Sequence, residues 1–209
     1  MTALGAGPGT LGMRNMPSIR RLCVYCGSSL GVAPQHRAAA AELGERLATA
    51  GIGLVFGGGR VGLMGVLADA ALAAGGHVTG IIPAGLRDAE LAHRGVSELV
   101  VVANMHERKR QMAERADAFA VLPGGIGTLD ETFEIMTWHQ LGLHSKPVWI
   151  VDIGGYWQPL LKIFDHLTAE GFAVALVPQI ARLAPSVAAL IEALQAVQSA
   201  PAGLRTDLV

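Results

Sequence analysis

Residues 118–131 read Ala-Phe-Ala-Val-Leu-Pro-Gly-Gly-Ile-Gly-Thr-Leu-Asp-Glu, and this stretch decides the fold. The apolar run Ala118–Leu122 predicts a buried strand. A Pro-Gly-Gly-x-Gly-Thr turn follows the strand, and a helical pattern over Leu129–Leu141 begins directly behind the turn. A buried strand that passes through a glycine-rich turn into a helix is typical of α/β proteins with a parallel sheet.

The same turn predicts an anion site. Its glycines allow backbone N–H groups to converge on one anion, and the positive end of the helix dipole strengthens the attraction. Glu131 lies one turn into the helix, and a carboxylate beside a phosphate site suggests catalysis. The alternative is a capping box, in which Thr128 is the N-cap and Glu131 is residue N3. The glycines in front of Thr128 favour the phosphate interpretation.

Strand-like and helix-like segments alternate along the rest of the chain. The predicted strands are Leu22–Cys26, Ile52–Phe56, Val78–Ile82, Glu98–Val102, Ala118–Leu122 and Lys146–Val151, with a short run over Gln179–Leu183. The predicted helices are Pro34–Ala50, a segment ending near Ala74, a short helix within Ala84–Ser97, Met105–Arg115, Leu129–Leu141, Tyr156–Glu170 and Pro185–Val197. This alternation predicts the α/β class, as a single Rossmann-like, doubly wound parallel sheet with helices on both faces.

Length and composition agree with one domain. The chain has 209 residues, of which 51% are hydrophobic, and a net charge of −1, so neither nucleic acid nor a membrane surface is an expected partner. No apolar run approaches the roughly 20 residues of a spanning helix. Residues 1–18 are predicted to be a disordered leader without a signal peptide, 19–198 the domain and 199–209 a loose tail, which together favour a cytoplasmic location.

Cys23 and Cys26 form a C-x-x-C pattern inside the first predicted strand. An odd separation places the two side chains on opposite faces of a strand. We therefore expect ordinary core cysteines, because a redox pair of this type opens a helix. No other cysteine is present to complete a metal site, and no metal or organic cofactor is expected.

Further unusual sequences follow other predicted strands. They are Gly27-Ser28-Ser29, the glycine-rich Gly57–Gly65 and the charged Asn104–Lys109. Ligands bind at the carboxyl ends of the strands in such sheets, so all these turns should share one rim with Pro123–Glu131. We include Ser28 and Gly58 in the predicted binding site for this reason.

Two of these stretches allow more than one interpretation. Gly57–Gly65 lacks the acidic residue of a dinucleotide site, so we favour a phosphate or ribose cradle; tight helix–sheet packing is the alternative. Arg108 and Lys109 near a helix start oppose the dipole, which suggests an anionic ligand. A solvated charged helix face explains them equally well.

Taken together, the motifs resemble those of the Lonely guy (LOG) family of cytokinin riboside 5′-monophosphate phosphoribohydrolases. The resemblance rests on P-G-G-x-G-T-x-x-E at 123–131, M-H-E-R-K at 105–109 and G-G-G-x-V-G-L-M-G at 57–65. The stretches C-V-Y-C-G-S-S at 23–29 and E-L-A-H-R-G at 90–95 also agree with it. The match runs from about Arg21 to Leu194; Asp130 is a departure, since Glu is commoner there.

The resemblance implies hydrolysis of the N-glycosidic bond of an N6-modified AMP, with AMP itself as a further candidate substrate. It implies that Glu131 and Arg108 are catalytic. The implied substrate contacts are Glu90, Arg108, Lys109, Gly124, Gly125, Ile126, Gly127, Thr128, Leu129, Asp130, Glu131 and Thr137, to which the rim argument adds Ser28 and Gly58. It also implies a homodimer or larger homo-oligomer with the site near the subunit interface.

Other functions are compatible with parts of the same pattern, including a nucleotide N-glycosidase that acts on another monophosphate. Relatives have been labelled lysine decarboxylases, but the chain has three lysines, of which only Lys109 could reach the rim. A non-catalytic nucleotide or cofactor carrier, as in the related molybdenum-cofactor carriers, is the remaining alternative. The presence of both Glu131 and Arg108 favours the enzyme.

Overall fold

The computed structural model describes residues 19–29, 33–88, 91–173 and 176–199. The predicted leader therefore lies outside the described residues, as does the predicted tail after residue 199. The described strands form one parallel sheet in the order β4-β3-β2-β1-β5-β6-β7. The strands are β1 (Arg21–Tyr25), β2 (Gly53–Phe56), β3 (Val78–Pro83), β4 (Glu98–Val102), β5 (Ala118–Val121), β6 (Val148–Val151) and β7 (Ala181–Ala184).

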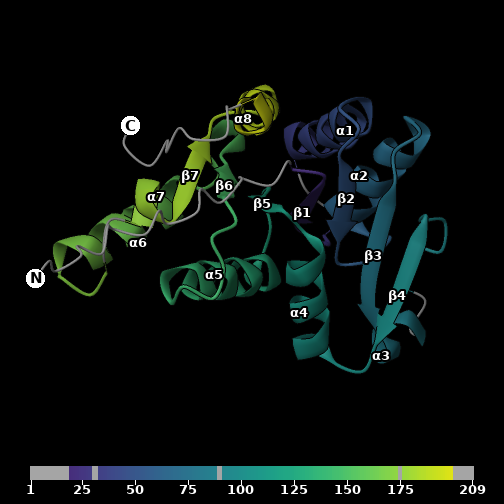
Figure 1. Cartoon of the computed structure of the whole chain (residues 1–209), viewed down its shortest axis with the longest axis horizontal. Helices are drawn as coiled ribbons and strands as arrows, with labels where there is room; N and C mark the ends of the chain where they lie inside the picture. The colour runs from purple at the N-terminus through teal and green to yellow at the C-terminus, as the bar shows by residue number, and fades with distance from the viewer. Residues whose placement is uncertain (1–18, 30–32, 89–90, 174–175, 200–209) are drawn as a thin grey trace, which may run out of the picture.

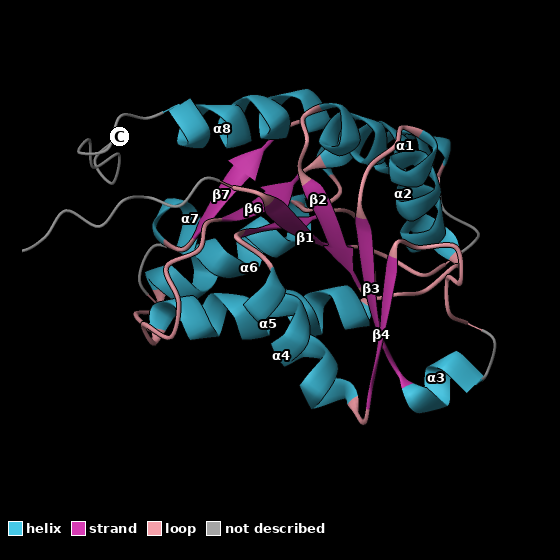
Figure 2. Cartoon of the chain, turned by 45° about the vertical axis from the view of Figure 1, so that its right-hand side comes forward, coloured by secondary structure: helices cyan, strands magenta, loops and turns pink. Residues whose placement is uncertain are grey.

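Helices cover both faces of the sheet (Figure 1). They are α1 (Pro34–Thr49), α2 (Gly62–Ala73), α3 (Ala84–Asp88), α4 (Met105–Arg115), α5 (Ile126–Gln140), α6 (Gln158–Ala169), α7 (Leu176–Gln179) and α8 (Val187–Ser199), with a 3-10 turn, η1 (Ile153–Gly155). Figure 2 shows α1, α2 and α8 on one face and α4, α5 and α6 on the other. The single doubly wound parallel sheet predicted from the sequence is confirmed.

Each face of the sheet has its own hydrophobic core. One cluster joins Leu22 and Val24 to side chains of α1, α2 and α8, and the other joins Cys23 and Tyr25 to side chains of α4, α5 and α6. Strands β3, β5 and β6 are short and almost wholly apolar, as expected for strands with both faces buried. Cys26 belongs to the first cluster and Cys23 to the second, so the predicted opposite placement of the two thiols is confirmed.

The order of the strands reverses between β1 and β5. The chain builds β1 to β4 outward in one direction and then returns to place β5 on the other side of β1. In the central strand β1, Leu22 pairs with Leu54 of β2 on one side and with Ala118 of β5 on the other. The connections that leave the carboxyl ends of β1 and β5 run to opposite faces of the sheet, which opens a crevice between them.

Most predicted elements agree with the structure, but the start of α5 was wrong. The helix begins at Ile126, three residues before the predicted Leu129, and its N-cap is Gly125. Thr128 is therefore a residue of the first helical turn, not the N-cap of a capping box. The predicted helix over Tyr156–Glu170 also begins later, at Gln158: Tyr156 ends the 3-10 turn η1, and Trp157 is the N-cap of the helix.

Candidate active site

A cavity of about 530 Å³ lies at the carboxyl ends of the central strands. Its lining residues come from the turns after β1, β2 and β5, from the end of β3, from α2, α3, α4 and α5, and from the segment after α3. They are Cys26, Gly27, Ser28, Ser29, Gly57, Gly59, Val61, Met64, Ile82, Leu86, Leu91, Arg108, Gly125, Ile126, Gly127, Thr128 and Glu131. The structure thus brings together residues from all four stretches that were expected to share one rim.

The start of α5 forms one wall of this cavity. Gly125–Thr128 line it, and no side chain caps the helix start at Gly125. The first N–H groups of an α-helix have no partner within the helix, and the dipole of this 15-residue helix adds positive potential there. A methyl group at position 124 would overlap the buried Thr128 side chain, so glycine is required for the turn to pack on its own helix.

Arg108 projects from α4 to the cavity and is held by three hydrogen bonds. Its Nε donates to the carbonyl of Ile81 at 3.1 Å, and its Nη2 donates to the carbonyl of Gly57 at 3.1 Å. Its Nη1 donates to Glu131 Oε1 at 2.8 Å. A methyl group at position 57 would overlap the guanidinium, which explains glycine at the end of β2. The side chain is therefore fixed from β2, β3 and α5 at once.

Glu131 is the acidic partner of this guanidinium. The Arg108 and Glu131 side chains are each only 9% exposed, so the pair is almost fully removed from bulk water. Burial raises the pKa of the Glu131 carboxyl above its ordinary value, and the charge and hydrogen bond of Arg108 oppose that shift. Oε1 is occupied by Arg108, while Oε2 accepts no hydrogen bond from the part of the chain that the structure describes. That oxygen is available to a ligand in the cavity.

Lys109 takes a different direction from its neighbour Arg108. Its ammonium contacts Asp130 and Glu134 of α5, each at 3.1 Å, and it does not line the cavity. Burial lowers the pKa of Lys109, but its hydrogen bonds to Glu134 and Asp130 outweigh this and the pKa lies above its ordinary value. Lys109 therefore joins α4 to α5 as a cation shared by two carboxylates.

The remaining predicted contacts differ in where they lie relative to the cavity. Ser28 lines the cavity, whereas Gly58, Gly124, Leu129 and Asp130 are close in sequence to lining residues without lining it themselves. Thr137 lies farther along α5, where its hydroxyl donates to the carbonyl of Phe133 at 2.7 Å. Glu90 lies outside the described residues.

The apolar wall of the cavity was missed by the sequence analysis. Met64, Ile82, Leu86 and Leu91 contribute to it, together with Cys26. Their apolar side chains at helix and strand positions are indistinguishable from core residues in a hydrophobicity pattern. Burial raises the pKa of the Cys26 thiol, so the thiol form is retained at neutral pH.

None of the three lysines is placed for Schiff-base chemistry in this cavity. Lys109 is paired with carboxylates, and Lys146 donates to the carbonyl of Ala113 at 2.7 Å. Lys162 is exposed on α6. Among the described residues, no group of three or more His, Cys, Asp or Glu side chains is arranged to hold a metal ion.

Comparison with known proteins gives the family. A family model described as "Possible lysine decarboxylase" matches residues 64–194. The probable cytokinin riboside 5′-monophosphate phosphoribohydrolase LOGL1 of Oryza sativa subsp. japonica is 46% identical over 175 residues, covering 84% of this chain and 78% of that protein. The chain belongs to the LOG family. The LOG-family enzyme LOG1 of Arabidopsis thaliana is 44% identical, covering 84% of this chain and 83% of that protein.

Solved structures confirm the fold of this LOG-family chain. The molybdenum cofactor carrier protein of Chlamydomonas reinhardtii superposes with a TM-score of 0.66 at 24% identity, covering 87% of this chain and 99% of that one. The molybdenum cofactor binding protein of Rippkaea orientalis gives 0.65 at 22% identity, covering 89% and 99%. At these identities the likeness extends to the fold alone.

Proposed function

We propose that this chain hydrolyses the N-glycosidic bond of an N6-modified AMP to release the free base and ribose 5-phosphate, with AMP as a further substrate. The observation that carries the proposal is the buried Arg108–Glu131 pair, 2.8 Å apart, on the wall of a cavity that also contains the uncapped start of α5. Relatives that are 46% and 44% identical to this chain, over 175 and 176 aligned residues, are named for that reaction.

The uncapped turn supplies a site for the 5′-phosphate. The N–H groups of the first turn of α5, at Ile126–Thr128, are suited to a dianion because the helix dipole adds to their hydrogen bonds. Phosphate bound there places the attached ribose next to Glu131, which lies one turn further along the same helix. Gly125, Thr128 and Ser28 are the proposed supporting contacts.

Glu131 is the proposed catalytic carboxylate. Departure of the base develops positive charge on C1′ and the ring oxygen of the ribose, and a neighbouring carboxylate stabilises that charge. Water then adds to C1′: its hydroxyl forms the new C–O bond, the C1′–N bond breaks, and a proton goes to the departing base. The free Oε2 of Glu131 can accept that proton from the water and pass it to the departing base, while Arg108 holds Oε1.

The apolar wall is the proposed site of the base. Met64, Ile82, Leu86 and Leu91 offer aliphatic surface to a purine and to an apolar N6 substituent. Lys109, Asp130, Leu129, Gly58, Gly124 and Thr137 remain proposed members of the site. From their positions, we propose that Lys109 and Asp130 act by holding α5 against α4.

A non-catalytic carrier on the same fold is the second candidate, and the buried ion pair argues against it. Two charges withheld from water lower stability unless they are paired well, and binding a nucleotide does not require them. The decisive experiment is incubation of the purified chain with isopentenyl-AMP, AMP and isopentenyladenosine, followed by chromatography of released bases. The proposal predicts free base from the monophosphates; tight binding of isopentenyl-AMP without any base released would support the carrier instead.

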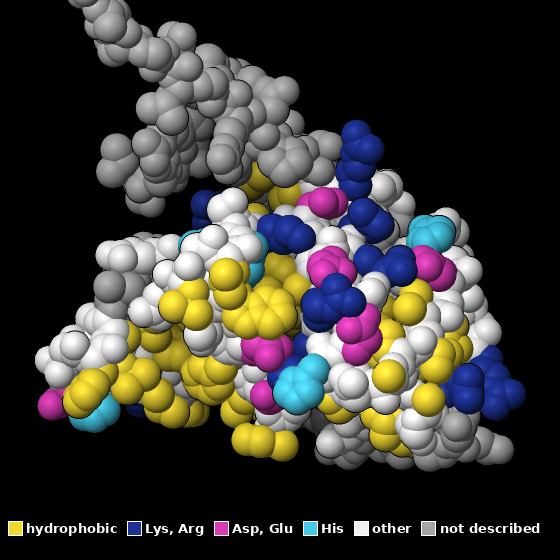
Figure 3. Space-filling model, turned by 60° about the horizontal axis from the view of Figure 1, so that its bottom comes forward, with side chains coloured by type: hydrophobic (Ala, Val, Ile, Leu, Met, Phe, Trp, Pro, Cys, Tyr) yellow, Lys and Arg dark blue, Asp and Glu magenta, His cyan; other side chains and the backbone are white. Residues whose placement is uncertain are grey.

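We also propose a homodimer or larger homo-oligomer, with a cytoplasmic location. Exposed apolar side chains gather over α5 and α6, toward the left of the face in Figure 3. They include Phe133, Leu141 and Ile163, and the loop after α6 adds Phe172 at 83% exposure. Such a patch favours self-association. The oligomeric state of the full chain can be measured by analytical ultracentrifugation. The described chain contains no helix long and apolar enough to cross a bilayer.

A further inference from the structure

Tyr156 contacts the glycine turn from outside the cavity. It follows η1, at the carboxyl end of β6, and its hydroxyl donates to the carbonyl of Gly124 at 2.7 Å. Its ring packs edge-on against His36 of α1 and Trp157, with centroid separations of 5.3 and 4.8 Å. This ring is thus held in place by two aromatic neighbours while its hydroxyl reaches the turn.

The bond from Tyr156 fixes the orientation of one peptide plane. A trans peptide holds its C=O and the following N–H on opposite sides, so the direction of the Gly124 carbonyl sets that of the Gly125 N–H. Gly125 lines the cavity, whereas Tyr156 does not. Holding the carbonyl toward Tyr156 therefore directs the Gly125 N–H away from Tyr156.

The preceding peptide of the turn is also held. The carbonyl of Pro123 accepts from the N–H of Gly27 at 3.1 Å, which joins this turn to the end of β1. Both carbonyls that precede α5 are thus occupied by donors from neighbouring elements. A hydrogen bond to a carbonyl also polarises its peptide, which strengthens the N–H on the other side as a donor.

We propose that Tyr156 is a positioning residue for the phosphate site: its hydroxyl orients and polarises the Gly124–Gly125 peptide so that the Gly125 N–H joins the start of α5 in binding the 5′-phosphate. This role rests on the proposed function for the identity of the substrate. Its consequence is selective: loss of the hydroxyl weakens binding of phosphate-bearing ligands and leaves the base and ribose contacts intact.

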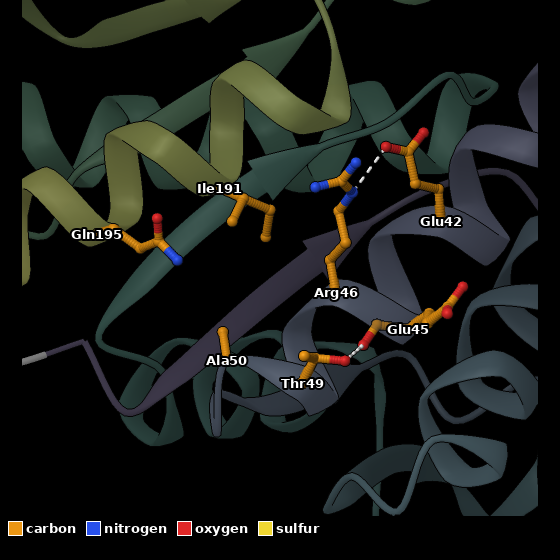
Figure 4. Close-up of a pocket in the computed structure, with 7 residues that line it drawn as sticks. All are labelled: Glu42, Glu45, Arg46, Thr49, Ala50, Ile191 and Gln195. Carbon is orange, nitrogen blue, oxygen red and sulfur yellow. Dashed lines mark hydrogen bonds and ion pairs between the residues drawn. The ribbon is translucent and has the colours of Figure 1, made fainter.

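Tyr156→Phe is the test, because phenylalanine keeps the ring packing against His36 and Trp157 and removes only the hydroxyl. The matched control is Thr49→Val, which removes a hydroxyl that donates to the carbonyl of Glu45 at 3.0 Å. Thr49 lies in a separate hollow between α1 and α8, which shares no lining residue with the cavity (Figure 4). Binding of ribose 5-phosphate, inorganic phosphate and adenosine is measured by calorimetry, and turnover is measured with isopentenyl-AMP.

Loss of one hydrogen bond predicts that Tyr156→Phe binds ribose 5-phosphate about fivefold more weakly, with KM for isopentenyl-AMP raised to a similar extent and kcat little changed. Adenosine affinity should stay the same, and Thr49→Val should match the wild type for every ligand. Equal weakening of ribose 5-phosphate and adenosine would overturn the inference in favour of a structural role, as would unchanged affinity for ribose 5-phosphate. The ratio of the two affinities does not depend on the folded fraction, so partial destabilisation leaves the result interpretable.

The same measurements separate this inference from the proposed function. A wild-type chain that binds ribose 5-phosphate but releases no base contradicts the hydrolase, while the effect of Tyr156→Phe on phosphate affinity still decides the role of the hydroxyl. A chain that releases base normally in both forms, with equal KM, supports the hydrolase and contradicts the role of Tyr156.

Discussion

The cavity side and the solvent side of α4 differ sharply although their residues are consecutive. Arg108 lies at the cavity with Glu131, both 9% exposed. Lys109, 10% exposed, contacts Asp130 and Glu134 on α5. Arg110 is exposed and pairs with Glu107 and Glu114 within its own helix.

Successive helical residues point about 100° apart, so a run of three cations divides among three environments. A short basic motif therefore does not by itself define one anion site. Burial and the partner distinguish the three residues, and this difference can be tested by substituting each of them and their partners.

The largest effect is expected at the acidic partner on the cavity side. Glu131→Gln keeps the shape of the side chain and removes its charge. Turnover should fall by about 10³-fold or more, because glutamine neither stabilises the positive charge at C1′ nor accepts the proton of the water. Substrate affinity, measured by calorimetry, should stay within about tenfold, as expected for a group that acts mainly in the transition state. Retained turnover would return Glu131 to a structural role.

Arg108→Lys should follow in magnitude. Lysine keeps the positive charge but cannot donate to Glu131, Ile81 and Gly57 at the same time, so kcat should fall about 100-fold. Steady-state kinetics with isopentenyl-AMP checks this, together with the melting temperature. A variant that is destabilised yet fully active when folded would contradict a role in holding Glu131.

The pH dependence of activity reports on the same pair. Because burial raises the pKa of Glu131 and the ionised form is required, activity should begin to fall at a pH above the ordinary range of glutamate and then decrease about tenfold per pH unit. A rate profile that falls only in the ordinary glutamate range would contradict this assignment.

The contribution of Glu131 to the stability of the fold should increase as the pH falls, whereas the activity decreases. A carboxyl whose pKa is raised on folding stabilises the folded state in full below its unfolded pKa, and this contribution is lost as the pH rises through the folded value. The difference in melting temperature between the wild type and Glu131→Gln should therefore shift in favour of the wild type as the pH falls. This comparison distinguishes loss of the active carboxylate from acid unfolding.

The smallest effects are expected on the sides of α4 that face away from the cavity. Lys109→Met leaves Asp130 and Glu134 without their shared cation, so stability should fall by about 1 kcal/mol and KM should rise a few-fold as α5 loosens. Arg110→Gln is the matched control and should change neither property measurably, since its ion pairs are exposed. If both variants behave alike, the distinction between these two sides of α4 is not real.

The sequence predicted which helices and strands form the site better than it predicted where each helix begins. The bounds of α4, Met105–Arg115, were predicted correctly, and in the structure the Asn104 side chain caps the helix start by accepting from the N–H of Glu107. The start of α5 was wrong because Thr128 and Glu131 match a capping box, whereas the helix begins at a glycine, which has no side chain to show the cap.

Side-chain direction is what the sequence could not supply. Adjacent charges such as Arg108 and Lys109 look alike in a motif, and only the packing of α4 against β2, β3 and α5 separates them. Tyr156 was missed for the same reason, because its contact with Gly124 joins segments far apart in the chain. The apolar wall of the cavity carries no signal beyond hydrophobicity.

The reversal of strand order at β1 has a consequence for how the protein is made. Gly57 and Arg108 belong to the half of the sheet that is synthesised first, while Glu131 arrives only after β5. Contacts between residues distant along the chain form slowly, so the docking of β5 on β1 is expected among the later folding events. A chain that ends before α5 contains Arg108 but not Glu131, so it lacks the ion pair. Enzyme activity therefore requires that α5 has been synthesised and has packed against α4. A chain whose translation stops before α5 is expected to be inactive.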